Sequence, residues 1–229
     1  EQHVVASSAY NYVSAAVLLL HPWLHGGQAY FYRRGRIEAL RTAGYGALTL
    51  DLPGFGESSR AEGFFDRDVE DAVRALKQRA SGLGLDLPLH LWGVSSGGYW
   101  AHLFLSRNDA VRGAFFEDVS AHLLEWSART TPAGRPLYAL YRHLLGTAYR
   151  FLDLRRHAPH LRVDAVSYVV GERDPGIPAD ETRDLATLAG GHALVVPDAN
   201  HLAAIQLARQ EVIALALATF AQAEAPPLE

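Results

Sequence analysis

The sequence predicts an α/β fold in which a mostly parallel sheet is covered by helices on both faces. Short apolar runs alternate along the chain with longer amphipathic stretches, the pattern of parallel strands joined by helical crossovers. The 229 residues are 49% hydrophobic and 20% charged, so the chain can bury a sizeable core and is too apolar for a disordered protein. These observations predict one globular unit.

Six strands are expected from the apolar runs, with helices in most of the spaces between them. The predicted strands cover residues 16–21, 46–51, 89–94, 111–117, 164–170 and 192–197, with a further edge strand at 3–8. The predicted helices cover residues 30–43, 66–81, 97–107, 178–189 and 202–222. The last helix carries its apolar residues on one stripe, so we expect it to pack on the sheet. The tail, residues 223–229, is expected to be frayed.

Residues 119–162 interrupt this alternation because they are too long for a simple crossover. Their apolar and aromatic residues recur at helical spacing. An insertion after a strand of an open parallel sheet lies above the carboxyl ends of the strands, where such sheets bind ligands. The sequence therefore predicts a core of residues 1–118 and 163–229 with a small helical cap at 119–162.

The composition disfavours several kinds of partner and site. The net charge of −4 offers no positive excess for nucleic acid, and no apolar run, such as the six residues at 15–20 or the seven at 212–218, is long enough to span a membrane. We therefore expect no nucleic-acid or membrane partner, and the absence of a visible secretory signal predicts a cytoplasmic location. The chain has no cysteine, which excludes disulfides, thiol catalysis and thiolate-bound metals.

Ser95 lies in the segment Gly93-Val94-Ser95-Ser96-Gly97, between an apolar strand and a predicted helix. Glycines two residues before and after a serine permit a sharp strand-to-helix turn that exposes the hydroxyl group. The dipole of the following helix favours negative charge at this point. The segment therefore predicts a serine nucleophile, which needs a base and a group that orients the base.

His201 is the predicted base, since it follows a strand and precedes the last helix and so lies at the carboxyl edge of the sheet. His192 competes for this role, but it begins a strand instead of following one. Asp174 ends another strand at the same edge and is the predicted orienting acid. Glu117 and Asp118, at the end of the preceding strand, remain alternatives for the acid.

These motifs resemble those of the α/β-hydrolase superfamily, in its branch with a serine nucleophile. Besides the serine turn, the resemblance rests on residues 18–21, 51–58, 170–174 and 197–201, which together extend over nearly the whole chain. Their order, serine then acid then histidine, is that of the family. The resemblance implies the α/β-hydrolase fold and a supporting role for the loop at 51–58.

The resemblance also implies an oxyanion hole made of two backbone N–H groups. One belongs to the residue after the nucleophile, here Ser96. The other comes from the loop after an early strand, where the family has His-Gly and this chain has His-Pro. Pro22 has no N–H, so we expect Trp23 to be the second donor, with Leu24 as the alternative. The His-Gly-Gly segment at 25–27 is another match to the family pattern.

The predicted function is that of a cofactor-free serine hydrolase that cleaves a small carboxylic ester through an acyl-enzyme. The residues expected to line the substrate pocket are Leu24, Trp100, Trp126 and Tyr138. No metal is expected, because His21 and His25 lie in a loop without carboxylates to complete a ligand set.

The same motifs fit other acyl chemistry, namely that of a thioesterase, lactonase, amidase, carbon–carbon hydrolase or acyltransferase. They also fit a non-catalytic protein of this fold that binds a small apolar ligand. Residues 119–160 of the predicted cap hold six arginines against Glu125 and Asp153, a net charge of +4. This charge either attracts an anionic acyl substrate or belongs to solvated helix faces.

Overall fold

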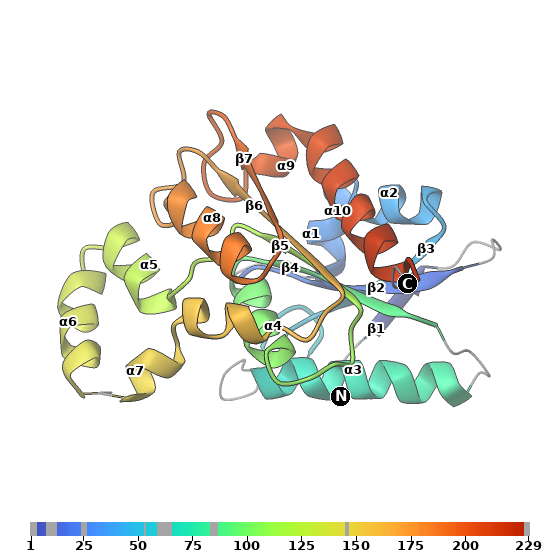
Figure 1. Cartoon of the computed structure of the whole chain (residues 1–229), viewed down its shortest axis with the longest axis horizontal. Coiled ribbons are helices and arrows are strands. Elements are labelled where there is room, and N and C mark those ends of the chain that lie inside the picture. Colours follow the sequence, from blue (N-terminus) through green and yellow to red (C-terminus); the bar gives the residue numbers. More distant parts are fainter. Residues whose placement is uncertain are drawn as a thin grey trace.

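The computed structural model describes residues 4–7, 13–23, 27–52, 54–58, 66–82, 87–144 and 147–226. These residues form a seven-stranded sheet with helices on both faces (Figure 1). The strands are β1 (Val4–Ser7), β2 (Ala15–Leu20), β3 (Tyr45–Leu50), β4 (Leu89–Val94), β5 (Gly113–Glu117), β6 (Ala165–Gly171) and β7 (His192–Val196). Their order in the sheet is β1-β3-β2-β4-β5-β6-β7, and β1 runs antiparallel to β3 while the other pairs are parallel. This topology confirms the predicted fold class.

The helices form two layers and one insertion. One face of the sheet carries α1 (Gly27–Arg33), α2 (Arg36–Thr42), α9 (Ala204–Leu207) and α10 (Arg209–Glu224). The other face carries α3 (Asp66–Gly82), α4 (Ser96–Leu105) and α8 (Ala179–Leu188). Between β5 and β6 come α5 (Leu123–Thr130), α6 (Gly134–Leu144), α7 (Thr147–Phe151) and the 3₁₀ helices η1 (Leu154–Arg156) and η2 (Ala158–His160). Figure 1 shows α5, α6 and α7 at the left, beyond one end of the sheet.

Strand β2 shows how alternating side chains divide the core into two halves. Leu18 and Leu20 pack into the cluster that includes side chains of α3, α4 and α8. Val17 and Leu19 pack into the cluster on the opposite face, with side chains of α1, α2 and α10. All four side chains are fully buried. A central parallel strand is covered on both faces, which explains why its sequence reads as an unbroken apolar run.

Two of the predicted helices are interrupted in the structure. The helix expected at 30–43 is divided into α1 and α2 by Gly35, which has a φ of 73°. Glycine adopts this left-handed conformation without steric cost, so the chain changes direction there. The helix expected at 202–222 is divided into α9 and α10 at Ala208, whose φ of −130° and ψ of 50° are not helical.

The ends of the chain differ in part from the prediction. The expected edge strand is present as β1 over residues 4–7, while residues 3 and 8 lie outside the described part of the chain. The prediction that the tail frays from residue 223 was wrong for Ala223 and Glu224, because α10 continues through both and Ala223 is buried. Residues 227–229 lie outside the described residues.

His102 of α4 makes the stability of the fold depend on pH. Its ring is fully buried, with Nε2 2.9 Å from the Tyr168 hydroxyl, and burial lowers its pKa to about 3. In the unfolded chain this histidine binds a proton near pH 6.5, whereas in the folded protein it binds one only near pH 3. One such group makes the free energy of unfolding fall by up to about 1.4 kcal/mol per pH unit as the pH drops through this window.

We expect His102→Gln to reduce the slope of the free energy of unfolding against pH by the contribution of one titrating group. Glutamine can keep the hydrogen bond to Tyr168 but does not titrate. Urea unfolding between pH 4 and 7 measures the slope. His192→Gln is the matched control, since it makes the same substitution at an exposed histidine, at the start of β7. Equal slopes in wild type and His102→Gln would contradict the prediction.

Candidate active site

Ser95 occupies a strained turn between β4 and α4. Its φ of 49° and ψ of −119° lie outside the regions that serine adopts freely, at a cost of about 1–3 kcal/mol. Two hydrogen bonds hold this conformation: Ser95 N donates to the Glu117 carbonyl oxygen, and Tyr99 N donates to the Ser95 carbonyl oxygen, both at 2.8 Å. The turn leaves the Ser95 side chain half-buried, at the carboxyl end of β4.

Three glycines make this turn possible. A Cβ atom on Gly93 would lie 2.4 Å from Gly98 Cα, and one on Gly97 would lie 2.5 Å from the His21 carbonyl oxygen. A Cβ atom on Gly98 would lie 2.5 Å from a methyl group of Val119. The pattern around the serine identified Gly93 and Gly97 but not Gly98. Together they let the first turn of α4 contact the ends of β2 and β4 directly.

The structure brings Ser95, His201 and Asp174 into a chain of hydrogen bonds. His201 Nε2 lies 3.2 Å from Ser95 Oγ, and His201 Nδ1 lies 2.6 Å from Asp174 Oδ2. The other carboxylate oxygen of Asp174 accepts hydrogen bonds from Gly176 N at 2.8 Å and Ile177 N at 3.1 Å. With the ring proton on Nδ1 and donated to Asp174, Nε2 can accept the proton of the serine hydroxyl.

The surroundings of His201 favour its protonated form. Burial by itself lowers the pKa of an imidazole, but the hydrogen bond and negative charge of Asp174 outweigh it, and the pKa of His201 is raised above 6.5. The Asp174 side chain is fully buried, whereas the His201 side chain keeps 22% of its surface exposed. The imidazole is therefore accessible to a small molecule and is stabilised as a cation by a carboxylate that solvent does not reach.

The alternative base and acids are placed differently. His192 is exposed at the amino end of β7, at the opposite edge of the sheet from His201. Glu117 is fully buried and its carboxylate binds the Arg36 guanidinium, with Nη2 2.6 Å from Oε1. Asp118 is also fully buried, but its carboxyl oxygens accept backbone N–H groups and not the His201 ring.

The buried pair of Arg36 and Glu117 is a feature that the sequence did not reveal. Arg36 lies in α2, where a basic residue in an amphipathic helix is typical of a solvated face. Trp92 Nε1 donates a further hydrogen bond to the Glu117 carboxylate at 3.2 Å.

Asp118, the next residue, has no guanidinium bound to its carboxyl group within the described part of the chain. Burial, followed by the neighbouring charge of Glu117, raises the pKa of Asp118 to about 8. Two adjacent acids thus have different electrostatic surroundings.

Trp23 and Ser96, the residues whose backbone N–H groups are the predicted oxyanion donors, are hydrogen-bonded to one another. Trp23 N donates a 2.8 Å hydrogen bond to Ser96 Oγ, and Ser96 begins α4, where backbone N–H groups lack intrahelical acceptors. The alternative donor Leu24 lies outside the described residues, as do residues 25 and 26. Gly27, the last residue of the His-Gly-Gly match, donates its N–H to Asp51 Oδ1 at 2.6 Å. The Trp23 amide therefore lies beside the serine turn but already has an acceptor.

The predicted pocket residues have separate surroundings. Trp126 of α5 is near the histidine, with its ring centroid 5.8 Å from that of His201. Trp100 is half-buried on α4, and its ring lies edge-to-face with Tyr99 at 5.1 Å. Tyr138 of α6 lies edge-to-face with a tyrosine of α7, at 5.8 Å. Trp126 is thus the pocket candidate that the structure brings beside the histidine.

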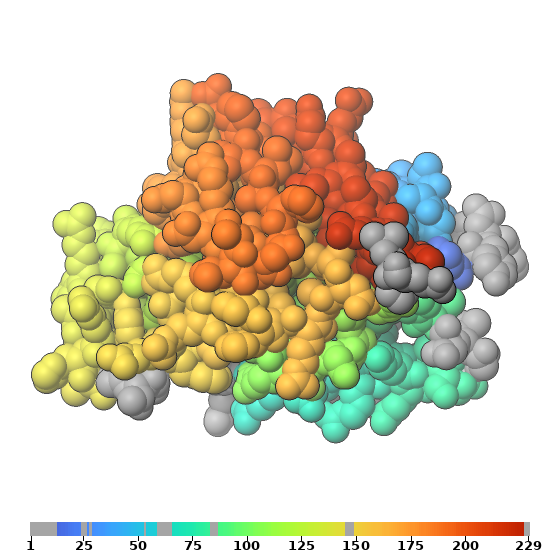
Figure 2. Space-filling view, viewed as in Figure 1, coloured from blue at the N-terminus to red at the C-terminus, as the bar shows by residue number. Residues whose placement is uncertain are grey.

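Helix α5 is hydrogen-bonded to the loop that carries Asp174. Arg129 Nη1 donates to the Gly176 carbonyl oxygen at 3.0 Å and to Glu181 Oε2 at 2.9 Å. A Cβ atom on Gly176 would lie 2.4 Å from the indole of Trp126. Because Gly176 N also donates to Asp174, α5 contacts the same loop that holds the Asp174 carboxylate. Figure 2 shows the yellow-green surface of the α5–α7 segment forming the left end of the molecule.

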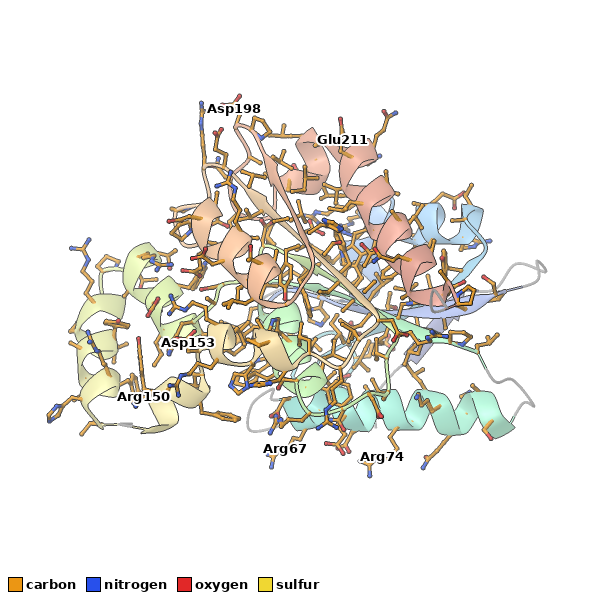
Figure 3. All side chains as sticks on the ribbon, viewed as in Figure 1. Arg67, Arg74, Arg150, Asp153, Asp198 and Glu211 are labelled. Atoms are coloured by element: carbon orange, nitrogen blue, oxygen red, sulfur yellow. The ribbon has the colours of Figure 1, made fainter. Side chains whose placement is uncertain are left out.

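Most arginines of the insertion are solvated. Four are exposed on its surface, namely Arg135, Arg142, Arg150 and Arg156. Figure 3 shows Arg150 on this segment, near Asp153 and far from Asp198 and Glu211. Arg129 and Arg155 form ion pairs with nearby carboxylates. This arrangement favours the interpretation of the basic residues as solvated helix faces.

Within the described residues, no three or more His, Asp or Glu side chains are grouped so that they could hold a metal ion. No helix in this part of the chain is long and apolar enough to cross a membrane. A surface hollow lined by Val111, Arg112 and Asp164 lies near the amino ends of β5 and β6, at the opposite edge of the sheet from Ser95.

Comparison with known proteins identifies the family of the chain. Residues 17–215 match the family described as "Alpha/beta hydrolase family". The chain belongs to this alpha/beta hydrolase family. A zebrafish (Danio rerio) relative, "Protein ABHD14A", is 35% identical over 98 residues, which are 41% of this chain and 33% of that protein. The matched segment thus spans about a third of the relative's length.

Solved structures of the alpha/beta hydrolase fold cover almost the whole chain. The Pyrococcus furiosus esterase Pf2001 is 17% identical, with a TM-score of 0.74 over 97% of this chain and 92% of that one. MGS-M2, an alpha/beta hydrolase from a deep-sea metagenome of the Medee basin, is 16% identical, with a TM-score of 0.70 over 100% and 96% of the two chains. At these identities the likeness is one of fold.

Asp174→Asn should move the pH dependence of any reaction that uses His201 as a base. Without the carboxylate, burial dominates, so the pKa of His201 falls and the acid limb of the rate profile shifts to lower pH than in wild type. The rate on the plateau should also fall, by up to about 10⁴-fold, since an amide does not hold the required tautomer. Rates with a chromogenic ester from pH 5 to 9 measure both effects. An acid limb at the wild-type pH would show that Asp174 does not control His201.

Gly176→Ala should destabilise the protein by about 1–3 kcal/mol, because the new methyl group overlaps the Trp126 indole. The cost should shrink in a Trp126→Ala background, where the nearest clash is removed and Thr130 Cγ2, at 2.8 Å, is the contact that remains. Urea unfolding of the two single variants and the double variant measures this coupling. Additive effects would mean that Gly176 and Trp126 do not meet as described.

Proposed function

We propose that this protein is a serine esterase that hydrolyses small carboxylic esters through an acyl-enzyme. The observation that carries the proposal is the chain of hydrogen bonds from Ser95 through His201 to Asp174, built at a strained strand-to-helix turn. A serine hydroxyl is a weak nucleophile, and this arrangement supplies the base and the orienting carboxylate that it needs. The esterase activity in the name of the Pyrococcus furiosus structure suggests the substrate class.

Acylation begins when Ser95 Oγ attacks the ester carbonyl carbon and His201 Nε2 takes the hydroxyl proton. The Asp174 carboxylate stabilises the imidazolium that forms. The carbonyl π electrons move to oxygen, and the backbone N–H of Ser96 and the amino end of α4 stabilise that negative charge. The tetrahedral intermediate collapses, the bond to the alcohol oxygen breaks, and His201 gives its proton to the leaving alcohol.

Deacylation repeats these steps with water. His201 Nε2 takes a proton from the attacking water molecule, the ester bond to Ser95 Oγ breaks, and the proton returns to the serine oxygen. Trp126, beside the His201 ring, is the apolar surface against which the acyl or alcohol group packs. No cofactor takes part in this scheme.

The Trp23 amide contributes to the oxyanion site in one of two ways. A substrate oxygen replaces Ser96 Oγ as the acceptor of the Trp23 N–H, or it accepts the Ser96 hydroxyl proton while that hydroxyl stays bound to Trp23. Both need Trp23 and Ser96 to be adjacent, and the 2.8 Å hydrogen bond supports that. Pro22 removes a backbone donor that the family's His-Gly sequence would supply.

Hydrolysis of p-nitrophenyl esters graded from acetyl to long acyl chains tests the proposal. We expect wild-type activity and a loss of about 10⁴- to 10⁶-fold in kcat for Ser95→Ala. Ser106→Ala is the matched control, because Ser106 follows the last residue of α4, at the opposite end of the helix from Ser95, and its hydroxyl contacts the Leu103 carbonyl oxygen and His157 Nδ1. Full turnover by Ser95→Ala would falsify the mechanism.

Labelling with a fluorophosphonate separates the remaining candidates. If Ser95 labels but no ester is cleaved, the substrate is a thioester, lactone, amide or carbon–carbon bond, or the acyl group goes to another acceptor. If Ser95 resists the probe in folded protein, the alternative is a non-catalytic protein that binds a small apolar ligand. The Trp23 N–H already bound to Ser96 Oγ is the observation that favours this alternative.

A further inference from the structure

We propose that Asp118 is a positioning residue that holds His201 in place through the backbone, an inference that rests on the serine mechanism proposed above. Asp118 follows β5 and is fully buried. One of its carboxyl oxygens accepts a hydrogen bond from Leu202 N at 2.9 Å, and the other accepts one from Gly171 N at 3.2 Å. Leu202 is the residue after His201, and Gly171 ends β6, three residues before Asp174.

The contact with Leu202 holds a conformation that the chain would not adopt alone. Leu202 has a φ of 62°, in the left-handed region that is sterically unfavourable for a leucine. The hydrogen bond from its N–H to the buried carboxyl group offsets that cost. The direction in which the backbone leaves His201, and with it the orientation of the imidazole, therefore depends on Asp118.

Asp118 acts through the backbone because both ring nitrogens of His201 already have partners. Nδ1 lies against Asp174 and Nε2 against Ser95. Asp118 consequently has no ring nitrogen to bind, which separates its role from that of the orienting acid.

The main chain next to this carboxyl group also touches the nucleophile. Glu117 O accepts the hydrogen bond from Ser95 N, and Asp118 N donates to Val169 O of β6, both at 2.8 Å. One dipeptide thus contacts the three segments that carry Ser95, Asp174 and His201. These two bonds use main-chain atoms and remain when the Asp118 side chain is replaced. A substitution there therefore removes only the carboxyl contacts, those with Leu202 N and Gly171 N.

Substitutions of decreasing hydrogen-bonding capacity test the proposal. Asp118→Asn has one acceptor oxygen in place of two and nearly the same volume, and Asp118→Ala has none. We expect kcat to fall about 10- to 100-fold for Asp118→Ala and less for Asp118→Asn, with KM within about threefold, as for a misplaced catalytic group. Thr219→Val is the control: it removes a buried hydrogen bond to Ser167, away from the site, and should lower thermal stability while keeping kcat.

A spectroscopic measurement separates this proposal from the proposed esterase function. The Nδ1 proton of His201, donated to Asp174, gives a far-downfield proton NMR resonance that Asp174→Asn identifies by removing it. In Asp118→Ala this resonance should shift or broaden, whether or not an ester substrate has been found. Failure of wild type to react with esters or fluorophosphonate would refute the esterase function alone. An unchanged resonance in folded Asp118→Ala, or a kcat loss no larger than in Thr219→Val, would overturn the role of Asp118.

Discussion

The candidate active site depends on the close approach of α4 to the ends of β2 and β4, where glycines leave no side chain between the backbones. Gly97 meets the carbonyl oxygen of His21, and Gly93 meets Gly98. A methyl group at any of these glycines would force α4 away from the sheet. The Ser96 N–H and the Trp23 amide would then separate, and Ser95 would lose the contacts that stabilise its unfavourable φ. The geometry of the nucleophile is thus a consequence of packing against glycine.

Three buried acids at the carboxyl edge of the sheet differ in their contacts and therefore in what their carboxyl groups can do. Glu117 faces the Arg36 guanidinium, which compensates its charge inside the core. Asp174 receives backbone N–H groups on one oxygen and the His201 ring on the other. Asp118 binds backbone N–H groups without a cation, so burial raises its pKa. Asp174 is therefore the acid that can stabilise a positive charge on His201 directly.

The insertion between β5 and β6 contributes to the site through its first helix. Arg129 and Trp126 of α5 both contact Gly176, in the loop that holds the Asp174 carboxylate. Helix α5 therefore contacts both the His201 ring, through Trp126, and the loop that holds the Asp174 carboxylate. Helix α6, further along the insertion, contacts α5 and exposes most of its residues, so it is the part free to vary without disturbing this loop.

The sequence by itself determined the parts of this protein that local patterns encode. Apolar runs predicted the strands of the parallel sheet, and the paired glycines predicted the turn at Ser95, because both depend on neighbours within a few residues. The order of serine, acid and histidine, together with the resemblance to the hydrolase family, singled out Ser95, Asp174 and His201. Breaks such as the one at Gly35 were missed, since one residue's φ does not change the surrounding helical periodicity.

Only the tertiary structure shows which of the predicted acid and its two alternatives meets the imidazole. Glu117 ends β5, Asp118 follows it, and Asp174 lies three residues beyond the end of β6, at the same edge of the sheet. The packing of these segments brings the Asp174 carboxylate to the imidazole. The same holds for Arg36, whose partner lies 81 residues away, and for Trp23 N, whose acceptor Ser96 Oγ is 73 residues away. Such contacts depend on how distant segments pack, and no local pattern carries that information.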